Sequence, residues 1–221
     1  MDVHGVVRIF RRAFDAILDA VIPPRERVVR TKARTLDDIP LSPVVHQLLG
    51  KEVTTIMRYQ EPAVQDLIRS LKYDGSLAAA TLAATALSDY LREEIANEKA
   101  FSPREIFLVP IPLHNVRKRE RGFNQIEIVL DALPKEFKDG TVSRLAPELL
   151  VRVRETRSQT HLPRMQRLKN VTGAFSATRV LKNVHVFLVD DVTTTGATLA
   201  SAGRTLGKAG AKVSLIALAR A

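Results

Sequence analysis

The sequence predicts an α/β fold, in which a parallel sheet is flanked by helices on both faces. Apolar runs of strand length recur along the chain, and segments with apolar residues at helical spacing separate them. The strand-like runs lie at 52–59, 106–112, 148–153 and 184–189, and a last run follows Gly210. Ligands in such sheets bind beyond the carboxyl ends of the strands, so functional residues are expected there.

The helices are expected between these strands. Pro62 can open the first of them, which Asp74 and Gly75 end. Its apolar stripe consists of Val64, Leu67, Ile68 and Leu71. Further helices are predicted at 76–97, 125–132 and 197–209. The charged segment after residue 153 predicts a mobile loop followed by a short helix.

The first 50 residues are expected to form a small helical hood or appendage, and residues 51–221 the main domain. Apolar residues at helical spacing around three arginines predict an amphipathic helix at 3–21, which Pro23 and Pro24 end. Two roles are open for this helix, packing on the domain and contact with a membrane surface. The stretch from there to Gly50 is polar, basic and proline-punctuated, which predicts a loop-rich connection.

The composition narrows the classes of partner and of compartment. A net charge of +10 favours phosphate-rich partners, either nucleotides or nucleic acid. The chain has no Cys, so it can form neither a disulfide nor a thiolate metal site, and a cytoplasmic location is expected. No window approaches the roughly 18 to 20 apolar residues of an integral membrane segment. Few aromatic residues are available for stacking on bases.

The strongest local pattern is VFLVDDVTTTGATL, in which an apolar strand leads to two acids, a threonine-rich turn and a helix. Gly196 permits a tight turn, and the free amides of a helix start together with hydroxyl groups can bind a phosphate. Two carboxylates beside an anion site are explained as acceptors for a ribose diol or as partners of a divalent cation. The candidate phosphate ligands are Thr193, Thr194, Thr195, Gly196, Ala197 and Thr198, and the candidate catalytic and Mg²⁺-binding acids are Asp190 and Asp191.

This pattern resembles the motif with which type I phosphoribosyltransferases bind phosphoribosyl pyrophosphate (PRPP). The segments DLIRSLKYDG at 66–75, VPIPLHNVRKRERGFNQ at 109–125 and the basic run at 152–175 resemble the other characteristic segments of the ComF family, also called the competence protein F family. The resemblance covers most of the chain from about residue 56 onward. It implies a type I phosphoribosyltransferase fold, with PRPP or a related ribonucleotide as ligand and Mg²⁺ as cofactor.

The resemblance also implies roles for the basic segments. The loop after the first core strand would receive pyrophosphate, through Arg117, Lys118, Arg119, Arg121, Asn124 and Gln125. A flexible loop would close over the ligand, with Arg154 in a catalytic role beside Arg152, Arg157, Ser158 and Gln159. Arg167 and Asn170 are expected to anchor the return of this loop.

One departure from the family pattern concerns metal. ComF proteins commonly begin with a cysteine-rich zinc module, whereas this chain has no Cys, so no zinc is expected. The five histidines are scattered, without the spacing of metal ligands. Any docking of partners that depends on the zinc module is in doubt for this chain.

Three functions are consistent with these features. The leading hypothesis is a ComF-like protein that binds PRPP with Mg²⁺ and transfers the phosphoribosyl group to a nitrogen acceptor, with a role in DNA uptake. The second is a noncatalytic factor that senses nucleotides or handles single-stranded DNA together with the DNA-uptake machinery. The third is a purine or pyrimidine salvage enzyme. Steep dependence of binding on salt would favour DNA.

Overall fold

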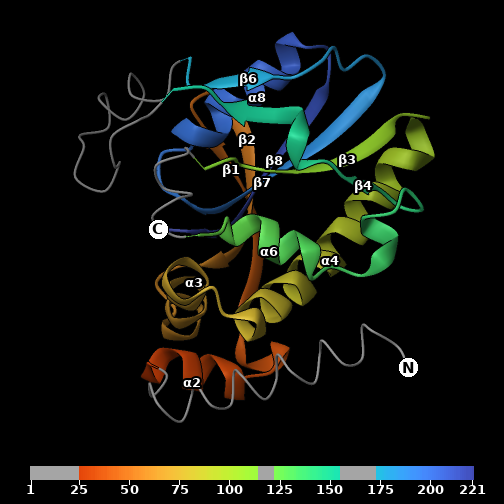
Figure 1. Cartoon of the computed structure of the whole chain (residues 1–221). Coiled ribbons are helices and arrows are strands. Elements are labelled where there is room, and N and C mark those ends of the chain that lie inside the picture. Colours follow the sequence, from red (N-terminus) through yellow and green to blue (C-terminus); the bar gives the residue numbers. More distant parts are fainter. Residues whose placement is uncertain (1–24, 114–121, 155–172) are drawn as a thin grey trace, which may run out of the picture.

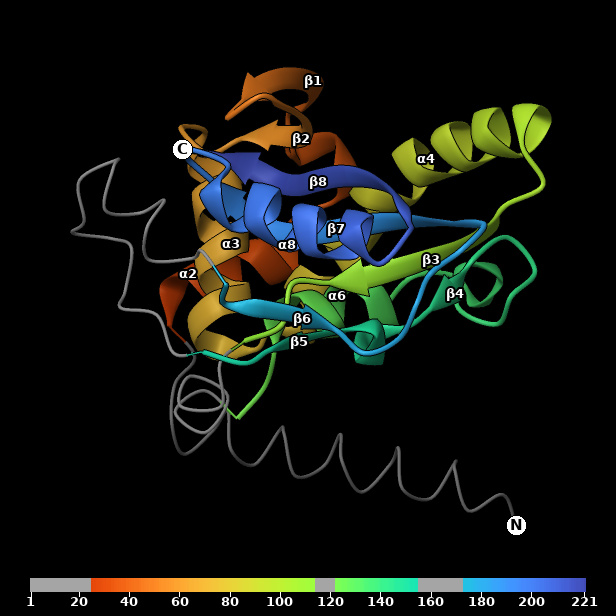
Figure 2. The same ribbon diagram turned by 90° about the horizontal axis from the view of Figure 1, so that it is seen from above.

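A computed structural model describes residues 25–113, 122–154 and 173–221, which form three layers (Figures 1 and 2). The middle layer is a six-stranded sheet with the order β1-β2-β8-β7-β3-β4. Its strands are β1 Leu41–Leu48, β2 Lys51–Arg58, β3 Glu105–Pro110, β4 Arg144–Leu145, β7 Val184–Thr193 and β8 Lys212–Arg220. Five of them are parallel, and only β1 runs antiparallel to its neighbour, β2. The parallel sheet with helices on both faces confirms the predicted fold class.

The central strand β7 is buried along most of its length and pairs with β3 on one side and β8 on the other. Its register places Val189 beside Pro110 and Thr193 beside Arg220. The carboxyl ends of the three strands therefore meet at one edge of the sheet. The segment after β7 begins at the centre of this edge.

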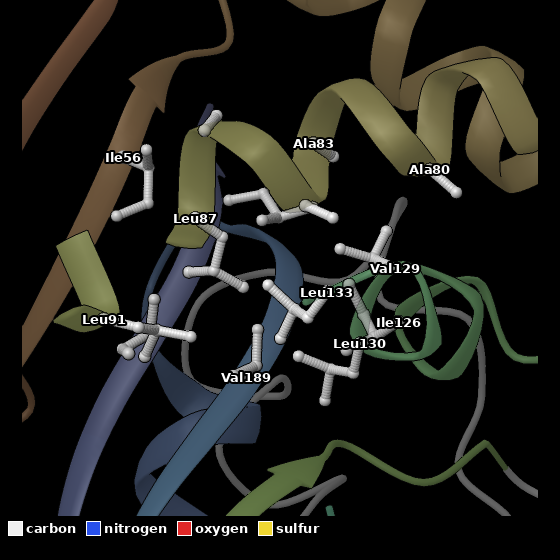
Figure 3. Packing of buried hydrophobic residues seen from close by; sticks show 14 of the residues in the cluster. Ile56, Ala80, Ala83, Leu87, Leu91, Ile126, Val129, Leu130, Leu133 and Val189 are labelled. Atoms are coloured by element: carbon white, nitrogen blue, oxygen red, sulfur yellow. The ribbon is translucent and has the colours of Figure 1, made fainter. Parts of the chain in front are cut away.

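Three helices cover one face of the sheet: α3 Pro62–Asp74, α4 Leu77–Phe101 and α6 Gln125–Asp131. Alanines on α4 allow α6 to approach closely, and Figure 3 shows Ala80 and Ala83 near Ile126 and Val129. Leu87 of α4 continues this core toward the strands. Within the described ranges, no helix combines the length and the apolar character needed to cross a bilayer.

The opposite face is covered by α8 Ala197–Lys208 and by a small antiparallel sheet, β5 Leu150–Arg152 and β6 Phe175–Ala177 (Figure 2). Leu199 and Leu206 of α8 lie in one buried cluster with Val186 and Leu188 of β7. Short 3-10 turns occupy Leu36–Asp38 (η1), Lys135–Phe137 (η2) and Pro147–Leu149 (η3). The predicted strand at 148–153 is therefore partly a 3-10 turn, and its extended part pairs outside the main sheet.

The loop-rich connection expected before Gly50 is wrong for residues 41–48. These residues form β1, which pairs with β2 through a turn at Leu49 and Gly50, both with positive φ. β1 lies at the edge of the sheet and none of its residues is buried, so it lacks the apolar run by which inner strands are predicted. A bulge at Ser42 and Pro43 breaks its register further.

The same expectation is wrong for residues 26–33, which form α2 Glu26–Ala33. Thr31 is the one buried residue of this helix, so α2 has almost no apolar face. Ion pairs with α3 hold it instead. Arg27 lies 2.7 Å from Asp74, and Arg30 lies 2.9 Å from Asp66.

Candidate functional site

The turn after β7 has the geometry that its sequence predicts. Gly196 is the N-cap of α8 and has a φ of 75°, in the left-handed region that glycine tolerates best. A Cβ at this position would lie only 2.7 Å from the Cβ of Leu48 at the end of β1. The turn therefore requires glycine both for its backbone conformation and for its close contact with the N-terminal hairpin.

The threonines of the turn divide into buried and accessible side chains. Thr193 is buried at the end of β7, where its carbonyl accepts a hydrogen bond from the Ala221 amide at 3.0 Å. Thr194 is exposed, and Thr195 and Thr198 are half-buried beside the start of α8. The first amides of a helix have no partner within the helix and attract anions. The accessible hydroxyl groups and this helix start thus make the segment 194–198 a candidate anion-binding turn.

Asp191 is the most firmly held side chain of the site, since it is buried and receives donors from three directions. Its Oδ2 accepts from Nε2 of Gln125 at 2.6 Å and lies 3.2 Å from Nζ of Lys72. Its Oδ1 accepts from the Val192 amide. No sequence pattern predicts a role for Lys72, although this residue lies in a segment that resembles the ComF pattern. A lysine in the last turn of a surface helix gives no local signal of a buried partner.

Asp190 is less tightly held. Its Oδ1 accepts from the Asp191 amide at 2.9 Å, and the residue is partly exposed. Burial of the carboxyl group, followed by repulsion from Asp191, raises the pKa of Asp190 to about 7, whereas the charges of Lys72 and Arg152 act in the opposite direction. The site therefore joins two acids with the ammonium group of Lys72, which comes from a distant part of the chain.

Asn124 and Gln125 lie at the end of the predicted pyrophosphate loop, where their side chains make hydrogen bonds within the protein. The Asn124 side chain caps α6 by accepting from the Ile126 amide at 3.0 Å, and its amide donates to the Ile111 carbonyl at 3.1 Å. Gln125 holds Asp191, as described above. The other residues predicted for this loop, Arg117, Lys118, Arg119 and Arg121, lie outside the described residues.

The predicted flexible loop begins at the end of β5. The Arg152 guanidinium lies 5.3 Å from the centre of the Phe175 ring, on the paired strand β6, and Arg154 is exposed. Arg152 also lines a cleft of about 470 Å³, together with Leu113 after β3 and Asn124 before α6. Arg157, Ser158, Gln159, Arg167 and Asn170 lie outside the described residues.

Asp191 is poorly placed to bind Mg²⁺ directly. Both oxygens of Asp191 already accept hydrogen bonds, and an ammonium group occupies the place of a cation beside it. In the described parts of the chain, no group of three or more His, Cys, Asp or Glu residues is arranged to hold a metal ion. Magnesium ions need several oxygen ligands in near-octahedral geometry. A bound Mg²⁺ would thus depend on oxygens of the ligand and on water.

Comparisons with known proteins show which family the chain resembles. Residues 121–221 match the phosphoribosyl transferase domain family. The DNA utilization protein YhgH of Salmonella typhi is 32% identical over 151 residues, which are 68% of this chain and 63% of that protein. The competence protein ComFC of Streptococcus pneumoniae is 30% identical over 164 residues, 74% of this chain and 66% of that protein.

A shorter match joins the chain to competence protein F of Haemophilus influenzae, with 34% identity over 119 residues, 52% of this chain and 50% of that protein. The chain thus spans between half and two thirds of the length of these relatives. The matches extend well beyond the acidic turn. The chain belongs to the ComF family of phosphoribosyltransferase-like proteins.

Proposed function

We propose that the carboxyl edge of the sheet binds the ribose and 5-phosphate of PRPP or of a related ribonucleotide. The observation that carries this proposal is the continuous unit of β7, two acids, a left-handed Gly196 and the start of α8. In this assignment the 5-phosphate lies in the anion-binding turn, and the carboxylates accept hydrogen bonds from the ribose hydroxyls. Arg152 and Arg154, which precede the predicted flexible loop, would balance the remaining phosphate charge.

The reaction that this site would support is transfer of the phosphoribosyl group to a nitrogen acceptor. A bond forms between the nitrogen and the anomeric carbon, the bond from that carbon to pyrophosphate breaks, and the nitrogen releases its proton. Arg152, which lines a cleft together with Asn124, would neutralise the charge of the departing pyrophosphate. In this proposal Mg²⁺ would bind together with the phosphate groups of the ligand. Its chemistry would be charge neutralisation.

The names of the relatives support a role in DNA metabolism. The matched proteins are called DNA utilization and competence proteins, and the present chain has a net charge of +10. We therefore propose a role in DNA uptake or use, with single-stranded DNA as a second candidate ligand. Affinity for DNA would fall steeply as salt is raised, because several phosphate contacts release counterions together. Affinity for a small phosphoribosyl ligand would fall less.

Calorimetric titration with PRPP tests the proposal directly. The wild type is compared with Asp190→Asn and with Asp37→Asn, an exposed acid on η1 that serves as the matched control. We expect binding by the wild type and by the control, and weaker binding by Asp190→Asn by roughly 10-fold or more, as for loss of a hydrogen bond to a charged group. Equal affinity of all three proteins, or no binding by the wild type, would contradict the proposal.

A further inference from the structure

Lys72 occupies an unusual place for a lysine, because its ammonium group points into the acidic site. Its Nζ lies 3.2 Å from Oδ2 of Asp191, and the side chains of the two residues are only 24% and 8% exposed. Surface lysines normally keep their ammonium group in water, because its removal from water is costly. A lysine that is withdrawn this far from water is compensated by its partner, and Asp191 is the partner of Lys72.

The helix that carries Lys72 has no other carboxylate free to compete for it. Asp66 and Asp74 are the only acids of α3, and both are taken by arginines of the N-terminal segment. Arg27 bonds to both oxygens of Asp74, and Arg30 bonds to both oxygens of Asp66. The docking of α2 therefore leaves Lys72 directed to Asp191.

The end of α3 is also fixed against the loop that supplies the second donor to Asp191. Gly75 caps α3 in the left-handed region with a φ of 58°, and a Cβ there would lie 3.0 Å from the ring of Phe123. Phe123 precedes the Asn124 and Gln125 pair, and Gln125 donates to Asp191. Lys72 and Gln125 thus reach one carboxylate oxygen from two elements that pack on each other.

We propose that Lys72 is a positioning residue that serves Asp191 as a built-in cation, so that the ribose 5-phosphate part of a ligand binds without a divalent metal. The inference rests on the proposed function of the site. A positive charge that is part of the fold offsets one of the two carboxylates before any ligand arrives, which lowers the repulsion felt by an incoming anion. It also keeps the Asp191 carboxylate in one orientation for a ribose hydroxyl.

Ribose 5-phosphate is the probe that isolates this contribution, since it lacks the pyrophosphate that would bring its own Mg²⁺. Its affinity is measured by calorimetry in EDTA and in Mg²⁺ for the wild type, Lys72→Met, Lys72→Arg and Arg69→Met. Arg69→Met is the matched control, because it removes one positive charge from an exposed position on the same helix. Thermal unfolding of each variant shows whether it is folded at the temperature of the titration.

We expect the wild type and Arg69→Met to bind equally well with and without Mg²⁺. Lys72→Met should bind roughly 10- to 100-fold more weakly in EDTA, as for loss of a charge-assisted hydrogen bond, and Lys72→Arg should recover part of the affinity. In a Lys72→Met/Asp191→Asn double variant the two losses should not add, because one substitution acts through the other. Such a result would support the inference.

Binding of ribose 5-phosphate by the wild type only when Mg²⁺ is present would overturn the inference while leaving the proposed function intact. The same holds for a folded Lys72→Met that binds as well as Arg69→Met. Failure of the wild type to bind either ribose 5-phosphate or PRPP, with or without Mg²⁺, would instead contradict the proposed function itself. The two failures are therefore distinguished by the wild-type titrations alone.

Discussion

Gly196 is the position at which the anion-binding turn should tolerate substitution least. Its φ of 75° belongs to a region that costs a residue with a Cβ about 1–2 kcal/mol. A Cβ at this position would also lie 2.7 Å from the Leu48 Cβ, an overlap whose relief by small shifts costs about 1–3 kcal/mol. We therefore expect Gly196→Ala to lower the free energy of unfolding by about 2–5 kcal/mol.

The measurement is equilibrium unfolding in urea, with Gly207→Ala as the matched control. Gly207 lies in the same helix, and a Cβ there would meet no atom within 4 Å. Alanine favours a helix over glycine by roughly 1 kcal/mol, so Gly207→Ala should leave stability unchanged or raise it slightly. A loss below about 1 kcal/mol for Gly196→Ala would refute the argument from the turn geometry.

A double variant separates the two parts of the cost. Leu48→Ala keeps the Leu48 Cβ but removes the atoms beyond it. One of these, Cδ1, would lie 3.2 Å from a Cβ on residue 196. The substitution also frees the edge hairpin to shift. The double variant should therefore be more stable than the sum of the single effects predicts, by about 1 kcal/mol or more, while the backbone strain remains. Strict additivity would mean that the hairpin does not constrain the turn.

Two further predictions concern the polar contacts around the site. Hydrogen bonding by Arg30, supported by Arg34, lowers the pKa of Asp66, so its stabilising contribution is complete above pH ~4 and is lost as the pH falls through the folded pKa. We expect Asp66→Asn to unfold with a free energy about 1–3 kcal/mol below that of the wild type at pH 7. This difference should shrink below pH ~4 when both proteins are compared by thermal unfolding. A difference that stays constant with pH would contradict the prediction. Asn124→Ala removes the cap of α6 and leaves the buried Ile111 carbonyl without this donor, which should cost about 1–3 kcal/mol in urea unfolding. A cost near zero would show that the loop end is not held by this side chain.

The inner strands could be predicted from the sequence because burial on both faces leaves a continuous apolar run. The runs at 52–59, 106–112 and 184–189 correspond to β2, β3 and β7, although β7 continues to Thr193. The continuation carries the acids, whose polarity ends the apolar pattern before the strand ends. Hydrogen bonding to β8 extends the strand through Asp190 and Val192.

The N-terminal elements could not be predicted in this way, because contacts with distant residues stabilise them. From sequence alone, the arginines of α2 indicate a solvent-exposed basic segment. Only the fold brings them to Asp66 and Asp74. The sequence of β1 predicts a loop, because exposed polar residues and Pro43 interrupt any apolar pattern. Pairing with β2 supplies the order that the local sequence lacks.

The candidate site likewise contains residues that the sequence predicts together and residues that only the fold brings there. Asp190, Asp191 and Gly196 form one continuous motif, so their proximity follows from the sequence alone. Lys72 reaches the site from a helix far earlier in the chain, and its ion pair is a property of the fold. The resemblance implies a ligand role for Gln125, and the fold adds a hydrogen bond from its side-chain amide to Asp191.

Asp191 is the point at which described residues from three segments of the family pattern meet. The segment 66–75 supplies Lys72, and the segment 109–125 supplies Gln125. The carboxylate itself comes from the motif at 186–199. Gly75 and Phe123 pack the first two segments together, so a change in either displaces a donor to the same oxygen, Oδ2 of Asp191. Substitutions in α3 that leave the turn at Gly196 untouched should consequently weaken ribose binding more than phosphate binding. This difference would appear as a larger loss of affinity for ribose 5-phosphate than for inorganic phosphate.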